Sequence, residues 1–122
     1  MWLQAYTLLG EEAMVKGVRH RYLAVKIESE KSFPKNIFMK AVLNSICRLY
    51  GIYGLSRTPI SLIEYKTDEK SAILRCSHDS TDQLRSAISS ITEIDGTPVY
   101  LRVIMISGTI KALKRKINKN FP

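Results

Sequence analysis

Residues 60–77 read ISLIEYKTDEKSAILRCS, and this stretch decides the fold. Two segments rich in apolar and β-branched residues, 60–66 and 71–77, flank the polar stretch 67–70. Apolar runs with alternating polarity, joined by a few polar residues, are typical of a β-hairpin. The sequence therefore predicts an antiparallel strand pair in the middle of the chain.

An amphipathic helix is predicted before this hairpin, over residues 32–51. Its apolar stripe repeats at helical spacing and consists of Phe38, Val42, Ile46, Leu49 and Tyr53. Ser32 is the expected N-cap, and Pro34 suits the first turn. Gly51 and Gly54 can supply the left-handed turn that ends the helix.

A second helix is predicted after the hairpin, over residues 80–92. Ser80 or Thr81 can cap it, and Asp82 favours its positive end. Its inner stripe consists of Leu84, Ala87, Ile88 and Ile91.

The outer parts of the chain supply two more strands, over residues 21–27 and 99–106. An Asp95-Gly96 turn and Pro98 precede the last strand. The complete order is β-α-β-β-α-β, which is the split βαβ arrangement of a ferredoxin-like α+β sandwich. Two helices should cover one face of this sheet, which leaves the other face for a further element or a partner.

An added basic helix is predicted from about residue 109 to 118. Ile110, Leu113 and Ile117 mark its buried stripe. The last strand has four consecutive apolar residues, 103–106, so both of its faces should be covered. The added helix can cover part of the face that the other two helices leave open.

The composition fits one globular domain whose basic excess favours a polyanionic partner, with a basic protein of a salty or hot cytosol as the alternative. The chain has 122 residues, of which 45% are hydrophobic, and a net charge of +8. Such an excess of Lys and Arg favours nucleic acid, because cations near phosphates release condensed counterions. The first 17 residues lack the features of a secretory signal, and no apolar run is long enough to span a membrane. We therefore expect an intracellular, soluble protein, with Cys47 and Cys76 reduced in the core.

Catalytic and metal-binding patterns are not found in the sequence. His20 and His78 have no ligand partners at suitable spacing. His78 and Asp79 could form a base and its orienter, but no nucleophile accompanies them. The strand 71–77 also lacks the aromatic residues with which RNA-recognition motifs stack bases. The acidic residues fall mainly in predicted turns and helix starts, where solvation explains them.

Two basic groups, distant in sequence, are expected to converge on one patch. If the first and last strands are antiparallel neighbours, the start of one lies beside the end of the other. A Ser-Gly-Thr turn would lie there too, with backbone N–H groups available to an anion. The alternative is a basic helix that its charge merely keeps soluble. The candidate phosphate-binding residues are Lys16, Arg19, His20, Arg21, Ser107, Gly108, Thr109, Lys111, Lys114, Arg115, Lys116 and Lys119.

Three short motifs resemble the Pop5/Rpp14 family, which is ribonuclease P protein component 2 in archaea. The segment 14–27, MVKGVRHRYLAVKI, is similar to the family's basic opening followed by His-Arg-Tyr-Leu. The segment 73–79, ILRCSHD, resembles its Leu-Arg-Cys motif, and 107–117, SGTIKALKRKI, resembles its closing segment. Residues 1–13 precede the point at which the family pattern begins, as either an extension or an upstream start. Residues 14–122 would then form a single RNA-binding domain.

The resemblance implies a noncatalytic subunit of cytoplasmic ribonuclease P, in which RNA cleaves the 5′ leader from precursor tRNA. Mg²⁺ is expected at the RNA active site, with no cofactor bound by this chain. The implied partners are ribonuclease P RNA, precursor tRNA indirectly, and a component-three protein of the Rpp30 type. Two such protein pairs would join as a heterotetramer through this subunit. The alternatives are a ferredoxin-like module that binds a small regulatory molecule and, less well supported by the residues, a small phosphatase.

Overall fold

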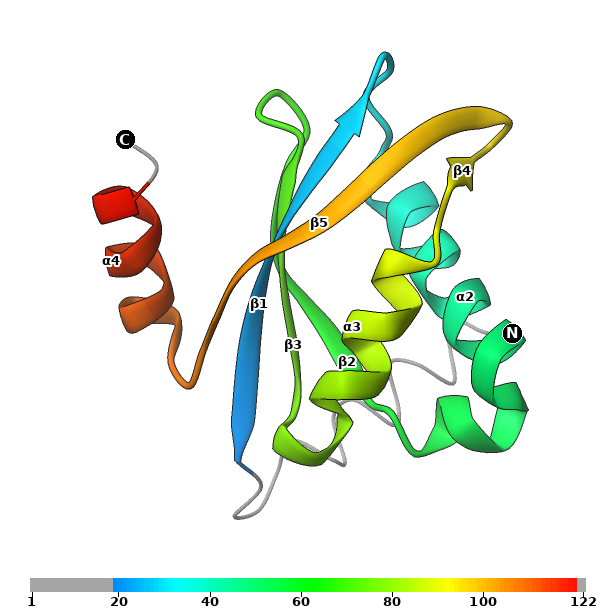
Figure 1. Ribbon diagram of the computed structural model, residues 1–122, viewed down its shortest axis with the longest axis horizontal. Helices are drawn as coiled ribbons and strands as arrows, with labels where there is room; N and C mark the ends of the chain where they lie inside the picture. Colours follow the sequence, from blue (N-terminus) through cyan, green and yellow to red (C-terminus); the bar gives the residue numbers. More distant parts are fainter. Residues whose placement is uncertain (1–18, 121–122) are drawn as a thin grey trace.

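The computed structural model describes residues 19–120, which form three layers (Figure 1). A five-stranded antiparallel sheet lies in the middle, with strand order β2-β3-β1-β5-β4. Helices α2 and α3 cover one face, and helix α4 lies on the other (Figure 1). The elements are β1 (His20–Ser29), α2 (Lys35–Ser56), β2 (Ile60–Lys66), β3 (Ser71–Ser77), the 3₁₀ turn η1 (His78–Ser80), α3 (Thr81–Ser89), β4 (Glu93–Ile94), β5 (Thr97–Ser107) and α4 (Ile110–Asn120).

The predicted fold class is confirmed. Strand β1 pairs with both β3 and β5 in antiparallel register, so the first and last long strands are neighbours. The hairpin strands begin and end at the predicted residues, 60–66 and 71–77. The two-residue strand β4 was not predicted. It pairs with the start of β5 across Asp95 and Gly96, which both have positive φ and so form a tight hairpin turn,.

The main core lies between the sheet and helices α2 and α3. Phe38, Ile46 and Leu84 are completely buried there, with Leu23 and Leu74 of the sheet opposite them. Cys76 belongs to this core, and burial raises the pKa of its thiol to about 11. Cys47 is only half-buried, so its predicted core position is wrong, although both cysteines are free as expected. Among the described residues, no helix is long and apolar enough to cross a membrane.

Helix α2 bends at Gly51, where φ is 75° and ψ is −179°. Gly51 is therefore a left-handed residue as predicted, but Gly54 is not, because the chain resumes a helical turn that ends only at Ser56. The predicted burial of Leu49 and Tyr53 is wrong. The bend shifts the helical phase of Tyr53, which follows it, whereas Leu49 precedes the bend and lies where the sheet and α3 no longer cover the helix. Leu49 is 45% exposed and Tyr53 is 71% exposed. These two residues, with Tyr50 and Ile52, form an exposed group that we call the α2 apolar patch.

The predicted caps of helices α2 and α3 differ from those observed. Helix α2 begins after Pro34, which makes no side-chain capping bond, and Ser32 lies outside the helix. Ser80 precedes α3, but its hydroxyl contacts Ser77 and the carbonyl of Arg57 instead of capping the helix. Helix α3 ends at Ser89, before the predicted boundary. Neither helix start is therefore held by a side-chain cap.

The second face of the sheet has a smaller core beneath α4. A β-bulge opposite Ala24 and Val25 leaves Ile104 without a partner in the β1–β5 register. As a result, the consecutive residues Ile104 and Met105 both pack on the α4 side,. Leu113 of α4 is completely buried against them, and the half-buried Ile110 and Ile117 flank it. The predicted stripe of α4 is confirmed, and this helix covers only part of the face.

Candidate nucleic-acid interface

The start of β1 and the end of β5 lie side by side, as the sequence predicts. Tyr22 pairs with Ser107, and α4 begins three residues after Ser107. The Arg21 Nη1 atom lies 3.5 Å from the position that a Cβ at Gly108 would take. An alanine at position 108 would thus make an ordinary contact with Arg21. The backbones of the two basic segments converge at this end of the sheet.

The side chains at this end do not all face the same way. Arg21 pairs with Cys76, whose side chain lies in the core under α2 and α3. Since paired residues of an antiparallel sheet share a face, Arg21 lies on the α2 and α3 side of the sheet edge. Helix α4, by contrast, lies against the opposite face. Arg21 and the cations of α4 therefore flank the end of the sheet from two sides.

His20 lies on the α4 side and is a poor cation. Its Nε2 atom is buried without a hydrogen-bond partner. Burial, and then the charge of Arg75, lower the pKa of His20 below its ordinary value of 6.5. His20 is therefore neutral at pH 7 and adds no positive charge to the predicted patch. Arg75 of β3, which the sequence analysis did not assign to the patch, is the cation that occupies this position.

The Ser107-Gly108-Thr109 turn supports α4. The Thr109 hydroxyl accepts a hydrogen bond from the Ala112 N–H at 3.1 Å, so Thr109 is the N-cap of α4,. Ser107 is buried, and its side chain is withdrawn from the surface. Gly108 is the exposed residue between them, with Arg21 beside it. The turn thus fixes where the basic helix begins.

Helix α4 presents a cationic surface away from its buried stripe. Four predicted residues are exposed there: Lys111, Lys114, Arg115 and Lys116. Arg19 is exposed at the start of β1, and its carbonyl accepts a hydrogen bond from the His78 N–H at 2.7 Å. Lys16 lies outside the described residues, and the side chain of Lys119 is not among those described.

Another cationic region, which the sequence analysis missed, lies between α4 and the β2–β3 hairpin. A cleft of about 950 Å³ occupies this part of the sheet face, and we call it the α4 cleft. Its cations come from five different elements or turns and are Lys26, Lys66, Lys70, Arg102 and Lys114. Within residues 19–120, no group of His, Cys, Asp and Glu is suited to hold a metal ion.

Together, these features define an α+β protein of ferredoxin-like fold with an added C-terminal helix and a strongly cationic second sheet face. A model of the Rpp14/Pop5 family matches residues 21–118, and the chain belongs to this family. The resemblance drawn from the sequence is confirmed.

Archaeal relatives share most of the chain. Ribonuclease P protein component 2 of Thermococcus gammatolerans is 31% identical over 103 residues, which cover 84% of this chain and 86% of the relative. The protein of the same name from Thermococcus kodakarensis is 34% identical over 98 residues, with coverage of 80% and 82%. That of Methanococcus vannielii is 32% identical over 98 residues, with coverage of 80% and 74%.

The fold also resembles that of a solved structure. A chain of the cryo-EM structure of yeast ribonuclease MRP superposes with a TM-score of 0.65. The match covers 83% of this chain and 90% of the yeast chain, at 20% sequence identity. At this identity, the likeness concerns the fold.

Proposed function

We propose that this chain is a noncatalytic protein subunit of ribonuclease P, with residues 14–122 as its RNA-binding domain. It would bind and stabilise the catalytic RNA, which removes the 5′ leader from precursor tRNA with its own Mg²⁺ ions. The family match over residues 21–118 is the observation that carries this proposal. The archaeal relatives named ribonuclease P protein component 2 favour it over a small-molecule regulatory module.

The exposed cations of α4 would contact RNA phosphates. Lys111, Lys114, Arg115 and Lys116 lie on one helix that begins at a capped turn and is anchored by Leu113. Contacts of this kind position RNA without reading its bases. Arg19 and Arg21 would extend the contact around the end of the sheet.

Reconstitution of the enzyme tests the proposal. The variant Lys114→Ala/Arg115→Ala/Lys116→Ala should bind ribonuclease P RNA roughly tenfold more weakly or worse, because three phosphate contacts are lost. Leader cleavage at limiting protein should fall with the affinity. Unchanged RNA affinity together with unchanged cleavage would reject the role of α4.

We also propose that the α2 apolar patch binds a protein subunit of the component-three type. Four large apolar side chains are exposed together there, and such groups on a protein surface mark interaction sites,. Arg57 supports the patch, since its Nη1 atom donates to the Tyr53 hydroxyl at 2.7 Å. Self-association into a heterotetramer would follow from the pairing, in the cytoplasm of an archaeal cell.

Charge placed in the patch tests this pairing. Ile52 and Tyr53 are 65% and 71% exposed, so Ile52→Glu/Tyr53→Glu should leave the monomer folded. Its affinity for the component-three protein, measured by calorimetry, should fall at least tenfold, because the contact would bury two charges. Tyr100→Glu is the matched control, since Tyr100 is a 60% exposed aromatic residue on β5. Equal affinity of all three proteins would reject the patch.

A further inference from the structure

The α4 cleft combines a cationic rim with an apolar floor. Five cations and three carboxylates line it, which leaves an excess of two positive charges. Ile104 of β5 and Ile117 of α4 supply half-buried apolar surface inside the cleft, beside the buried Ile73. No aromatic side chain is found among the described residues that line it.

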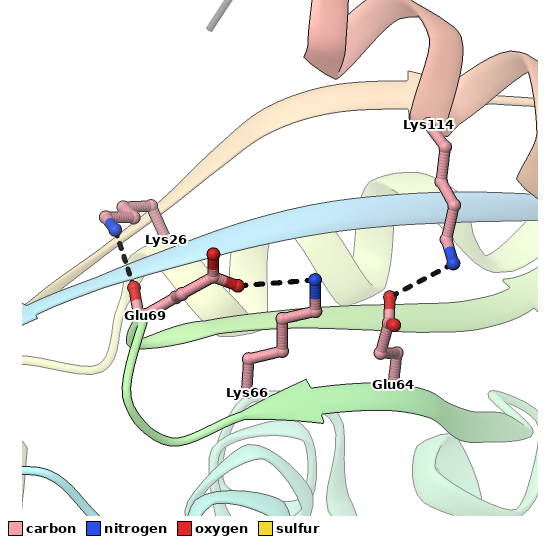
Figure 2. A network of polar contacts seen from close by, with 5 residues as sticks. All are labelled: Lys26, Glu64, Lys66, Glu69 and Lys114. Carbon is pink, nitrogen blue, oxygen red and sulfur yellow. Dashed lines mark hydrogen bonds and ion pairs between the residues drawn. The ribbon is translucent and has the colours of Figure 1, made fainter. Parts of the chain in front are cut away.

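The cations of the cleft are held by acceptors of this same chain. Figure 2 shows Lys114 reaching from α4 to Glu64 of β2, with a distance of 3.5 Å between Nζ and Oε2. At the hairpin, Lys66 Nζ lies 3.3 Å from Glu69 Oε2, and Lys26 donates to the Glu69 carbonyl oxygen at 2.6 Å (Figure 2). The acceptors therefore spread the cations along the cleft.

Ion pairs within the described part of the chain concentrate here. The structure shows three of them among residues 19–120, and each includes a residue that lines the cleft. The third joins Arg102 to Glu28 at 3.0 Å. All six side chains are substantially exposed, from 32% for Glu64 to 62% for Glu69. Solvated pairs of this kind are weak, so another anion can displace the carboxylates.

We propose that the α4 cleft binds a single-stranded RNA segment, whose phosphates replace Glu64 and Glu69 as partners of Lys114 and Lys66. This inference rests on the proposed function. It adds a second RNA-binding site beside the outer surface of α4, and Lys114 belongs to both. Unpaired bases can lie on the apolar floor, whereas a duplex keeps its bases stacked inside and would leave that floor uncovered. Without aromatic stacking, the cleft should discriminate little between base sequences.

Glu64 and Glu69 have a specific role in this proposal. While the cleft is empty, they hold the two lysines in place. When RNA enters, both carboxylates are left beside phosphates of the same charge. Their removal should therefore strengthen RNA binding, which is the opposite of what the loss of a structural ion pair would produce.

Anisotropy measurements with a labelled oligouridine and a labelled RNA hairpin of equal length test the site. Lys26→Ala/Lys66→Ala should lower the affinity for oligouridine roughly tenfold, because the phosphate contact of Lys66 and the neighbouring charge of Lys26 are both lost. Glu64→Gln/Glu69→Gln should raise that affinity several-fold at low salt and much less at high salt, where the repulsion is screened. A misfolded protein could not give this gain. Lys40→Ala/Arg85→Ala, which removes two exposed cations from α2 and α3, is the matched control and should bind like the parent.

The affinity of the parent protein for intact ribonuclease P RNA separates this inference from the proposed function. The α4 cleft is rejected if Lys26→Ala/Lys66→Ala binds oligouridine like the parent, or if Glu64→Gln/Glu69→Gln binds it no more tightly than the parent. It is also rejected if the hairpin binds as tightly as oligouridine. The proposed function still stands in those cases, provided that the parent binds ribonuclease P RNA and Lys114→Ala/Arg115→Ala/Lys116→Ala binds it more weakly. Failure of the parent to bind that RNA would reject both.

Discussion

The two faces of the sheet differ in what they bury and in what they leave exposed. The face under α2 and α3 carries the main core, in which side chains such as Phe38, Ile46 and Leu84 are completely buried. The face under α4 has one completely buried residue of the helix, Leu113, and beside it a cleft with exposed ion pairs. The first face therefore supplies the stability of the fold, and the second keeps its charges available to a partner.

The two faces should differ most in how much stability is lost when one buried side chain of each core is truncated to alanine. Phe38→Ala should lower the free energy of unfolding by about 4 kcal/mol, because it leaves a cavity in the closely packed main core. Leu113→Ala should cost about 2 kcal/mol, since the small cluster can collapse around the gap. Urea unfolding followed by circular dichroism measures both. Equal losses would mean that both faces contribute alike to stability.

Loss of the Thr109 N-cap should destabilise α4 and leave the sheet unaffected. Thr109→Ala removes the acceptor for the Ala112 N–H and should destabilise the helix by about 1 kcal/mol,. Hydrogen exchange of the α4 amides should accelerate, while amides of β1 and β3 keep their protection. Thr109→Ser, which keeps the hydroxyl, should behave like the parent. Equal acceleration in the sheet would contradict the separation of the two faces.

The pH dependence of stability should carry a contribution from His20. Its folded-state pKa lies below 6.5, so the unfolded chain binds more protons when the pH falls below that value. Stability from this residue is therefore present above pH 6.5 and decreases as the pH falls towards the folded-state pKa. His20→Gln should flatten the decrease in urea unfolding at stepped pH values. An unchanged slope would show that His20 is not desolvated beside Arg75.

The ion pair between Lys114 and Glu64 should contribute least. Both side chains are partly exposed, so a double-mutant cycle with Lys114→Ala and Glu64→Ala should give a coupling of about 0.3 kcal/mol,. The coupling should disappear in high salt. A coupling well above 1 kcal/mol would mean that RNA cannot easily displace Glu64.

Local patterns predicted the fold well because hydrophobic periodicity reports which face of an element is buried. Strands β2 and β3 have the predicted bounds, and the stripe of α4 is correct. The error at Tyr53 of α2 has a local cause, because the positive-φ residue Gly51 shifts the helical phase of the residues that follow it. Strand β4 has only two residues, too few for a periodic pattern to show. The sequence predicted the Asp95-Gly96 turn beside it but not the strand itself.

The candidate site was harder to predict because it depends on which elements the sheet places together. The basic run of α4 is visible in the sequence, and the convergence of β1 with the end of β5 follows from the topology. The cations of the α4 cleft are single residues scattered over the chain. Only the strand order and the position of α4 bring Lys26, Lys66 and Arg102 into one cleft. Because these residues are far apart in the sequence, no local pattern predicts that they share a cleft.

The salt dependence of RNA binding tests the central claim, that the α4 side of the sheet faces RNA. The affinity of ribonuclease P RNA would be measured across a salt series for Lys114→Ala/Arg115→Ala/Lys116→Ala and for Lys35→Ala/Lys40→Ala/Arg85→Ala, whose cations are exposed on α2 and α3. Both variants lose three positive charges. We predict that the first weakens binding and makes the slope of log affinity against log salt less negative by about 2, while the second leaves the slope unchanged. Equal slopes for the two variants would contradict the claim.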